Sequence, residues 1–408
     1  MLNQLLHWLK EKQPFFLKGL LAFLFVDVMV DPNNLIFHAK YVLFALVFVV
    51  WLPGILSKKL IVPKQLWYAV IFISLFMPFY ALSMGLINSF LHNTPVGNLV
   101  YFNSFFFFLI VLVIANEKID LTWLFNNSSL LIVLMTLSFY LILIFNSHLF
   151  GSLYQYFVAD KGVAVYALRN YGEVTLLMIF YKTSPLLVFP LSYYLFQILI
   201  DKQRKAPFVH YLLVVLIAIT LFLSGTRANL LSLVLIIIFY LGFYVYRKSK
   251  LWFVLLGSLG LLIALFTMPS IAGLLLNQHE ASNVIKFGYL SSYADFFNQH
   301  ILSLIFGQGI GGSFYASVLQ RFTNVSELTY FELIRIWGVP ISIVFAGTLI
   351  WPLLAEIKAK RLSHLFIAYV AYLFIAGTNP LLLSSTGMLV LVYVFSISMG
   401  SNRILKTG

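Results

Sequence analysis

Twelve long apolar runs follow one another along the 408-residue chain and leave little room for any other kind of fold. A helix needs about 20 apolar residues to cross the hydrocarbon core of a bilayer, where every backbone polar group must find its partner within the segment. We therefore predict an all-α polytopic membrane protein with about twelve transmembrane helices in a single integral membrane domain, residues 1–408. The runs are 15–30, 35–52, 66–88, 98–115, 124–147, 184–200, 208–224, 227–246, 251–268, 328–350, 363–379 and 381–399.

The composition supports this prediction and narrows the function. The chain is 62% hydrophobic and 10% charged, whereas soluble domains carry about 25% charged residues. The absence of cysteine excludes disulfides, thiol catalysis and cysteine-ligated metal centres. The formal net charge is +13, but the basic residues lie in short clusters between apolar runs, which is typical of membrane topology. We expect a membrane environment, no nucleic-acid partner, no cofactor and no metal.

The distribution of lysine and arginine predicts the orientation of the helices. With the N-terminus in the cytoplasm, 18 of the 26 basic residues fall on inner segments and 8 on outer segments. This excess agrees with the bias of cytoplasmic loops toward positive charge. Both termini are then cytoplasmic, and two long loops, about 149–183 and 269–327, lie on the outer side. Loops of this length in a compact protein are usually functional.

Three arginines lie on the predicted outer side, where cations run against this bias. They are Arg169 in the first long loop, Arg227 at the start of an apolar run and Arg335 just after the second long loop. A guanidinium matches two phosphate oxygens at once, so an anionic ligand such as a lipid-linked pyrophosphate explains all three. Arg227 follows a tight turn allowed by Gly225, and contact with lipid headgroups is a second interpretation for it.

The segment from Glu327 to Gly338 carries charged residues at the start of an apolar run. Glu332 and Arg335 are three residues apart, so on a helix they share one face. One interpretation is an intrahelical ion pair that neutralises both charges near the membrane. The other places Arg335 on a phosphate and a glutamate near a sugar hydroxyl. Both hold if Glu332 orients Arg335.

Glycines cluster at Gly307-Gln-Gly-Ile-Gly-Gly312 in the second long loop. The string superficially matches a dinucleotide-binding loop, but no strand–helix–strand unit surrounds it. It predicts instead a turn, or a backbone that approaches a sugar or phosphate. His279 and His300 precede it in the same loop. They are structural or solvated in one interpretation, and contribute to proton transfer in the other.

Several strings, taken in order after an arginine-bearing outer loop, resemble the Wzy-type O-antigen polymerase family. The resemblance covers about residues 155–385, and it lies in the order of the strings, each of which is loose by itself. The strings are Tyr181-Lys-Thr-Ser-Pro-Leu-Leu187, Ser224-Gly-Thr-Arg227, Phe306-Gly-Gln-Gly-Ile-Gly311, Glu327-Leu-Thr-Tyr-Phe-Glu-Leu-Ile-Arg335 and Thr378-Asn-Pro380.

This resemblance implies a GT-C-like, metal-independent glycosyltransferase of the bacterial inner membrane, with its active site facing the periplasm. Such an enzyme transfers a growing glycan from undecaprenyl pyrophosphate to the nonreducing end of a lipid-linked repeat unit, together with a chain-length-determining co-polymerase. The related O-antigen ligases typically carry a histidine in the large outer loop. Residues 307–335 contain none, which favours a polymerase. A ligase, and a lipid-linked oligosaccharide flippase or transporter, are the alternatives.

The implied reaction assigns roles to residues of this chain. We assign the three outer arginines to the donor pyrophosphate, because preorganised cations stabilise a departing anion. The acceptor hydroxyl calls for a general base, and the candidates, in order, are Glu332, Glu327 and Asp295. Further substrate contacts are expected from Arg321, Lys182, Tyr154, Tyr156 and Tyr330.

The absence of cysteine makes the predicted orientation testable with single cysteines. Val325→Cys, in the second long loop, is expected to react with a membrane-impermeant maleimide in intact cells. Ser249→Cys, between two apolar runs on the predicted inner side, is the matched control and should react only after the membrane is permeabilised. Labelling of Ser249→Cys in intact cells, with Val325→Cys protected, would reverse the orientation.

Overall fold

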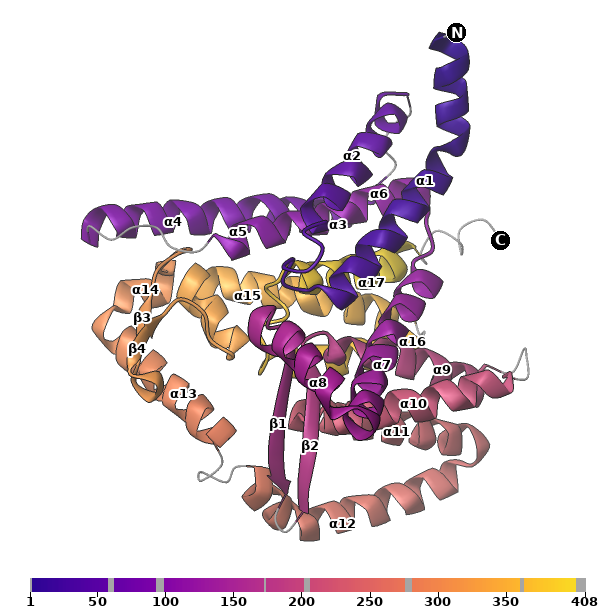
Figure 1. Ribbon diagram of the computed structural model, residues 1–408, viewed down its shortest axis with the longest axis vertical. Coiled ribbons are helices and arrows are strands. Elements are labelled where there is room, and N and C mark those ends of the chain that lie inside the picture. Colours follow the sequence, from indigo (N-terminus) through magenta and orange to yellow (C-terminus); the bar gives the residue numbers. More distant parts are fainter. Residues whose placement is uncertain are drawn as a thin grey trace.

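The computed structural model describes residues 2–57, 62–92, 99–171, 174–201, 206–275, 281–359 and 363–400. Helices make up nearly all of this structure, and two antiparallel hairpins accompany them (Figure 1). The prediction of a helical architecture is confirmed, although the hairpins depart from a strictly all-α chain.

The elements of the N-terminal part follow the first five apolar runs and end in a hairpin. They are α1 (Leu2–Val30), α2 (Lys40–Ser57), α3 (Lys64–Val70), η1 (Ile71–Phe76), α4 (Met77–His92), α5 (Val100–Phe105), η2 (Phe106–Leu109), α6 (Ile110–Glu117), α7 (Thr122–Phe145), α8 (Ser147–Tyr154), η3 (Gln155–Asp160), β1 (Ala164–Tyr171) and β2 (Val174–Tyr181).

The C-terminal part contains the remaining seven apolar runs and a second, smaller hairpin. Its elements are η4 (Ser184–Leu187), α9 (Val188–Leu199), α10 (Phe208–Leu223), α11 (Arg227–Lys248), α12 (Lys250–Leu275), α13 (Ala281–Gln299), α14 (Ile301–Phe306), β3 (Phe314–Ala316), η5 (Ser317–Leu319), β4 (Arg321–Thr323), α15 (Thr329–Lys358), α16 (His364–Ala376) and α17 (Ser385–Gly400).

Each predicted run corresponds to an apolar helix. Within the described ranges, five helices are long and apolar enough to cross a membrane, and seven shorter apolar helices complete the twelve. These helices support a membrane-embedded protein. The five are Lys12–Val30, Lys64–Leu91, Thr122–Phe145, Arg227–Lys248 and Thr329–Lys358.

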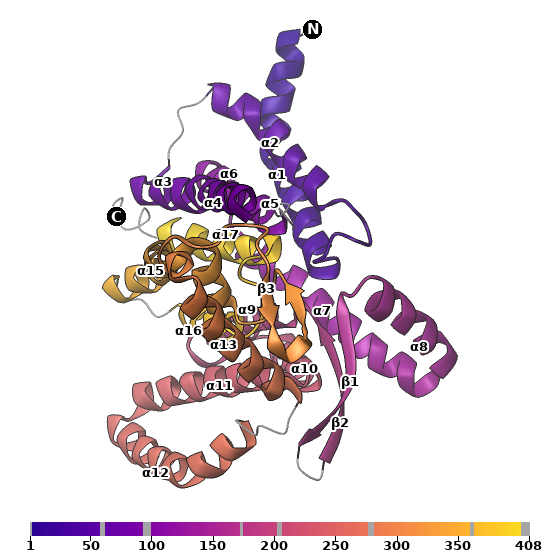
Figure 2. The same cartoon turned by 90° about the vertical axis from the view of Figure 1, so that its left-hand side faces the viewer.

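The most buried helices lie at the centre of the bundle. α17 and α16 carry long runs of buried side chains, and Figures 1 and 2 show both enclosed by the other helices. Aromatic rings fill much of this core. Phe125 of α7 stacks on Tyr393 of α17 with ring centroids 4.2 Å apart, and Phe189 of α9 contacts both rings edge-on. At the opposite extreme, α12 packs on α11 and presents apolar side chains outward, as lipid contact requires.

Both segments that we expected to be long loops contain regular structure. In residues 149–183, β1 and β2 pair along their full length from Ala164↔Tyr181 to Tyr171↔Val174. In residues 269–327, the helix α13 and the hairpin β3–β4 are added. The sequence did not predict α13 because its apolar residues do not form a single stripe. Such a stripe is the usual sequence signal of a packed helix.

A break in α15 connects this second segment to the membrane helices. Gly338 has φ +77° and interrupts the helix, and Pro340 brings no N–H to the carbonyl of Ile336 four residues earlier. That carbonyl accepts instead from Gly309 N–H at 3.0 Å. The neighbouring carbonyl of Arg335 accepts from Gln308 N–H at 2.6 Å. The glycine-rich loop thus replaces the missing helical hydrogen bonds.

Replacement of Gly338 is expected to damage this junction. A Cβ at Gly338 would lie 2.1 Å from the carbonyl oxygen of Ile305, and its positive φ is unfavourable for alanine. We expect Gly338→Ala to lower the free energy of unfolding by about 2 kcal/mol or more, measured by thermal unfolding in detergent micelles. Gly347→Ala, in the same helix with nothing within 4 Å of its added Cβ, is the control. Equal unfolding midpoints for the two variants would disprove the proposed constraint.

Candidate functional site

The polar side chains of the second long segment gather along α13. Figures 1 and 2 show this helix running from the β3–β4 hairpin toward the C-terminal end of α12. Its first half contacts the start of α11, and its second half packs on the β3–β4 hairpin and faces α15. α13 therefore contacts most of the parts of the chain that hold the predicted site residues of this segment.

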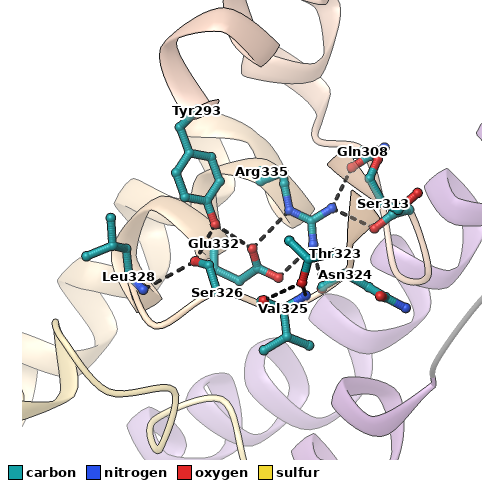
Figure 3. A network of polar contacts seen from close by, with 11 residues as sticks. Tyr293, Gln308, Ser313, Thr323, Asn324, Val325, Ser326, Leu328, Glu332 and Arg335 are labelled. Carbon is teal, nitrogen blue, oxygen red and sulfur yellow. Dashed lines mark hydrogen bonds and ion pairs between the residues drawn. The ribbon is translucent and has the colours of Figure 1, made fainter. Parts of the chain in front are cut away.

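Arg335 and Glu332 form a buried ion pair at the start of α15 (Figure 3). Their side chains are each 1% exposed, and Arg335 Nη2 lies 2.6 Å from Glu332 Oε1. Arg335 Nε also donates to Glu332 Oε2 at 2.9 Å. The carboxylate lies in the first turn of its helix, where the helix dipole favours a negative charge. The intrahelical ion pair predicted from the three-residue spacing is confirmed.

The same guanidinium binds two further parts of the segment, the glycine-rich loop and the stretch after β4. Its Nη1 donates to the side-chain oxygen of Gln308 and, at 2.7 Å, to the carbonyl of Gly312. Its Nη2 donates to the carbonyl of Asn324 at 2.9 Å. With the two bonds to Glu332, all five N–H groups of the guanidinium are used. In this conformation Arg335 has no donor left for a phosphate, which corrects its assignment to the donor pyrophosphate.

Glu332 is equally occupied. Its Oε2 accepts from Tyr293 OH of α13 at 2.7 Å in addition to Arg335, and Tyr293 OH lies 2.6 Å from Ser326 Oγ. Burial and the carboxylate beside it raise the pKa of Tyr293 well above its usual range, so the phenol keeps its proton. A carboxylate that is fully buried and held by three hydrogen bonds is not placed to take a proton from a substrate.

The glycine-rich loop is held against α4 by close backbone contacts. Gly309 has φ +80°, and a Cβ there would lie 2.0 Å from the backbone nitrogen of Gly85. Ile310 N–H donates to the carbonyl of Ala81 at 2.8 Å, and Asn88 Nδ2 donates to the carbonyl of Gln308 at 2.7 Å. The loop is a turn, as predicted, and its glycines are required by its approach to another helix.

A pocket of about 650 Å³ opens beside this loop. Its walls are polar groups, the glycine-rich backbone and four aromatic rings, and Asp295 and His300 are its acidic and imidazole side chains. None of the described residues that line it is a lysine or an arginine. Its lining residues are Gly85, Asn88, Ser89, Ser292, Asp295, Phe296, Gln299, His300, Ser303, Gln308, Gly311, Gly312, Ser313, Phe314, Tyr315, Ser317 and Phe322.

Arg321 of the β3–β4 hairpin is not among the described residues that line this pocket. Tyr315 pairs with Phe322, and Ala316 pairs with Arg321. Successive side chains of a strand point to opposite faces, so Arg321 lies on the face opposite to the Tyr315 and Phe322 rings. Arg321 acts instead near Tyr289 of α13. Burial raises the pKa of Tyr289, the charge of Glu327 raises it further, and Arg321 opposes that effect.

Arg227 lies at the other end of α13. Its Nη1 donates to Asn283 Oδ1 at 3.0 Å. The adjacent Gly225 packs against Met178 of β2, whose atoms would lie 2.8 Å from an added Cβ. Met178 pairs with Ala167 of β1, two residues before Arg169. The backbone of Arg169 is thus near the turn that carries Arg227, while the Arg169 side chain lies outside the described part of the chain, as does His279.

The three outer arginines do not meet at one point. Arg227 contacts α13 at Asn283, whereas the Arg335–Glu332 pair contacts it at Tyr293. Ten residues of α-helix rise about 15 Å, which is longer than a pyrophosphate group. A single clamp that contains both Arg335 and Arg227 is therefore not formed.

The remaining predicted contacts are spread over the bundle. Lys182 Nζ lies 3.5 Å from Asn33 Oδ1, and burial lowers its pKa. Tyr154 packs edge-on against Tyr166 at 5.6 Å, and Tyr156 lies under the ammonium of Lys161 at 5.5 Å. Tyr330 OH donates to the carbonyl of Leu373 at 2.6 Å and joins α15 to α16. Of the predicted substrate contacts, Asp295 alone lines the large pocket.

Sequence reasoning missed most of the pocket. Asp295, Phe296, Gln299 and His300 share one face of α13, at the spacing of neighbouring turns of a helix. That spacing was visible in the sequence, but it carries meaning only once the segment is known to be helical. The polar residues contributed by α4, such as Asn88, had no signal of their own because they meet the loop only in the folded chain. Among the described residues, no three histidine or carboxylate side chains gather.

Comparisons with known proteins leave the site to be judged on its geometry. Neither a scan against protein-family models nor searches of curated proteins and of solved structures found a match.

Loss of one partner of the buried ion pair is expected to be costly. Arg335→Ala leaves Glu332 charged and buried without its counter-ion, and we expect a loss of about 3–5 kcal/mol in the free energy of unfolding. The double variant Glu332→Leu/Arg335→Met should recover part of this loss because it removes both charges. Arg321→Ala, at an exposed site, should cost less than about 0.5 kcal/mol. Denaturation in detergent measures all three, and equal values for Arg335→Ala and Arg321→Ala would refute the structural role.

Proposed function

We propose that the protein is an O-antigen polymerase that works at the periplasmic face of the bacterial inner membrane. It transfers a growing glycan from undecaprenyl pyrophosphate to the nonreducing end of a lipid-linked repeat unit. The observation that carries the proposal is the group of residues on and beside α13, which we call the α13 segment. It combines a polar, aromatic pocket of about 650 Å³ with a cationic end at Arg227, on a chain otherwise composed of apolar helices. All twelve apolar helices are taken as transmembrane spans.

The proposed reaction forms one bond and breaks one bond. An acceptor hydroxyl oxygen attacks the anomeric carbon of the donor sugar, and the bond from that carbon to the pyrophosphate oxygen breaks. Undecaprenyl pyrophosphate leaves with the bonding electrons, and a base takes the hydroxyl proton. The principal demand is stabilisation of the departing anion, which preorganised cations meet. The Arg227 guanidinium, at the start of α11, adds the positive end of a helix dipole to its own charge.

The base is assigned by elimination among the three predicted carboxylates. Glu332 is held by Arg335 and Tyr293. Asp295 is twelve residues from Asn283, a rise of about 18 Å along α13, so it is far from an anion bound at Arg227. Glu327 is exposed and acts near Tyr289, between these two positions. We therefore propose Glu327 as the base and Asp295 as a glycan contact.

An O-antigen ligase is the second candidate, and one observation favours it. Ligases typically carry a histidine in the large outer loop, and His300 lines the pocket although it precedes the glycine-rich string in sequence. The two enzymes differ in acceptor, since a ligase transfers the glycan to lipid A-core and a polymerase to a second lipid-linked repeat unit. Supplying each acceptor separately to the same preparation decides between them.

The decisive experiment uses the full-length protein in liposomes with lipid-linked repeat units on its outer face. A ladder of glycans longer than one repeat supports the polymerase. Product on lipid A-core alone supports the ligase. Movement of the lipid-linked unit across the bilayer without bond formation supports a flippase and rejects the proposal.

Substitutions in the same assay are expected to separate the proposed roles. Arg227→Ala should lower the rate about 10- to 100-fold, since it removes a charge-assisted hydrogen bond to the leaving group. Arg227→Lys should restore only part of it, because a lysine lacks the bidentate fork. Glu327→Gln should lower the rate at least about 100-fold if it removes the base.

Asp160→Asn is the matched control, because Asp160 is an exposed carboxylate of η3, outside the α13 segment. It should retain the full rate. Wild-type ladders from both Arg227→Ala and Glu327→Gln, at equal protein levels, would remove these two residues from the mechanism.

A further inference from the structure

The pocket beside the glycine-rich loop indicates which class of sugar the protein would accept, and this inference rests on the proposed function. Its position is the first clue. Asp295 lies about 18 Å along α13 from the residue that contacts Arg227. A sugar in the pocket is therefore several glycan residues away from a pyrophosphate at Arg227. The pocket is therefore positioned to bind a sugar of the repeat unit that lies away from the bond being formed.

The wall of the pocket combines flat aromatic surfaces with hydrogen-bonding groups. Tyr315 and Phe322 are 50% and 70% exposed, and their rings pack edge to face with centroids 5.5 Å apart. Asn88 and Gln299 add amide groups on other walls. Apolar surface with a few placed polar groups is the usual composition of a small-ligand site, and it matches the apolar faces and hydroxyl edges of a pyranose.

The charge of the pocket is the second clue. Asp295 is exposed within it and makes no hydrogen bond or ion pair with any described residue. No lysine or arginine is among the described residues that line the pocket. The Arg335 guanidinium is bonded to Glu332, Gln308 and backbone carbonyls. His300 and Tyr315 are the other ionisable side chains among the described lining residues.

We propose that this pocket binds an uncharged pyranose of the repeat unit and that Asp295 excludes acidic sugars. A carboxylated sugar would bring a second negative charge close to Asp295. Two like charges that are close together repel appreciably at a partly desolvated site. A neutral sugar meets no such penalty, and its hydroxyl groups can donate to the carboxylate.

Binding of simple glycosides to the full chain in lipid nanodiscs tests the proposal. The probes are methyl glycosides in neutral and acidic pairs that differ only at C6, glucoside with glucuronide and galactoside with galacturonide. Dissociation constants come from saturation-transfer NMR titrations at pH 8. We expect at least one neutral glycoside to bind about tenfold or more tightly than its acidic partner.

Variants assign the discrimination to the pocket. Asp295→Asn should reduce the gap to within about threefold because it removes the charge, and Asp295→Lys should reverse it because it inverts the charge. Asp160→Asn should keep the wild-type gap. Tyr315→Ala should weaken neutral and acidic glycosides alike. Equal binding of the two classes by the wild type, an unchanged gap in Asp295→Asn, or no binding by any neutral glycoside overturns the proposal.

The outcome is separable from that of the polymerase test. Polymer formation without charge discrimination in the pocket leaves the proposed function standing and removes this inference. Discrimination that depends on Asp295, in a protein that forms no polymer and no ligation product, keeps the pocket and rejects the enzyme.

Discussion

The guanidinium of Arg335 joins three stretches of chain, its own helix and two segments that lie 11 to 27 residues earlier. It binds Glu332 on its own helix, Gln308 and Gly312 in the glycine-rich loop and Asn324 after the β3–β4 hairpin. A buried charge is tolerated only when it is paired and its donors are satisfied, and here each of the five N–H groups has an acceptor. Without this residue the loop, the hairpin and the start of α15 would share few polar contacts.

A second constraint acts from the backbone. Gly338 and Pro340 interrupt α15, and an interrupted helix near a membrane leaves carbonyl groups that need donors. The glycine-rich loop supplies them, and its own glycines let it lie against α4. The break, the loop and the ion pair therefore form one unit. The polar pocket is built beside that unit, with Gln308, Gly311 and Gly312 of the loop in its wall.

The placement of the cations changes the picture of substrate binding. A clamp of three arginines would hold one pyrophosphate, but the described contacts separate Arg335 from Arg227 along α13. We propose that Arg227 is the end that binds an anion. None of the described residues lining the pocket around Asp295 is a lysine or arginine, and we propose a sugar as its ligand. A long ligand with an anionic end and a glycan body fits this order, and a lipid-linked oligosaccharide is such a ligand.

Much of the architecture could be predicted from the sequence because it depends on local properties. Uninterrupted apolar runs have few alternatives to a helix in a membrane, so all twelve correspond to helices. The spacing of Glu332 and Arg335 places them on one helix face in any surroundings, and their ion pair followed. The turn at the glycine-rich string is also a property of its residues.

The pocket, the distribution of the arginines and the role of Arg335 were decided by tertiary structure alone. α13 has no one-sided apolar stripe, so the formation of this helix depends on contacts with α15 and β3. These elements lie later in the sequence. Whether Arg335 binds a phosphate or its own protein depends on which carbonyl groups surround it, and these come from residues 11 to 27 positions away. The sequence determines which groups a side chain can bind, but only the folded chain determines which of those groups lie within hydrogen-bonding distance.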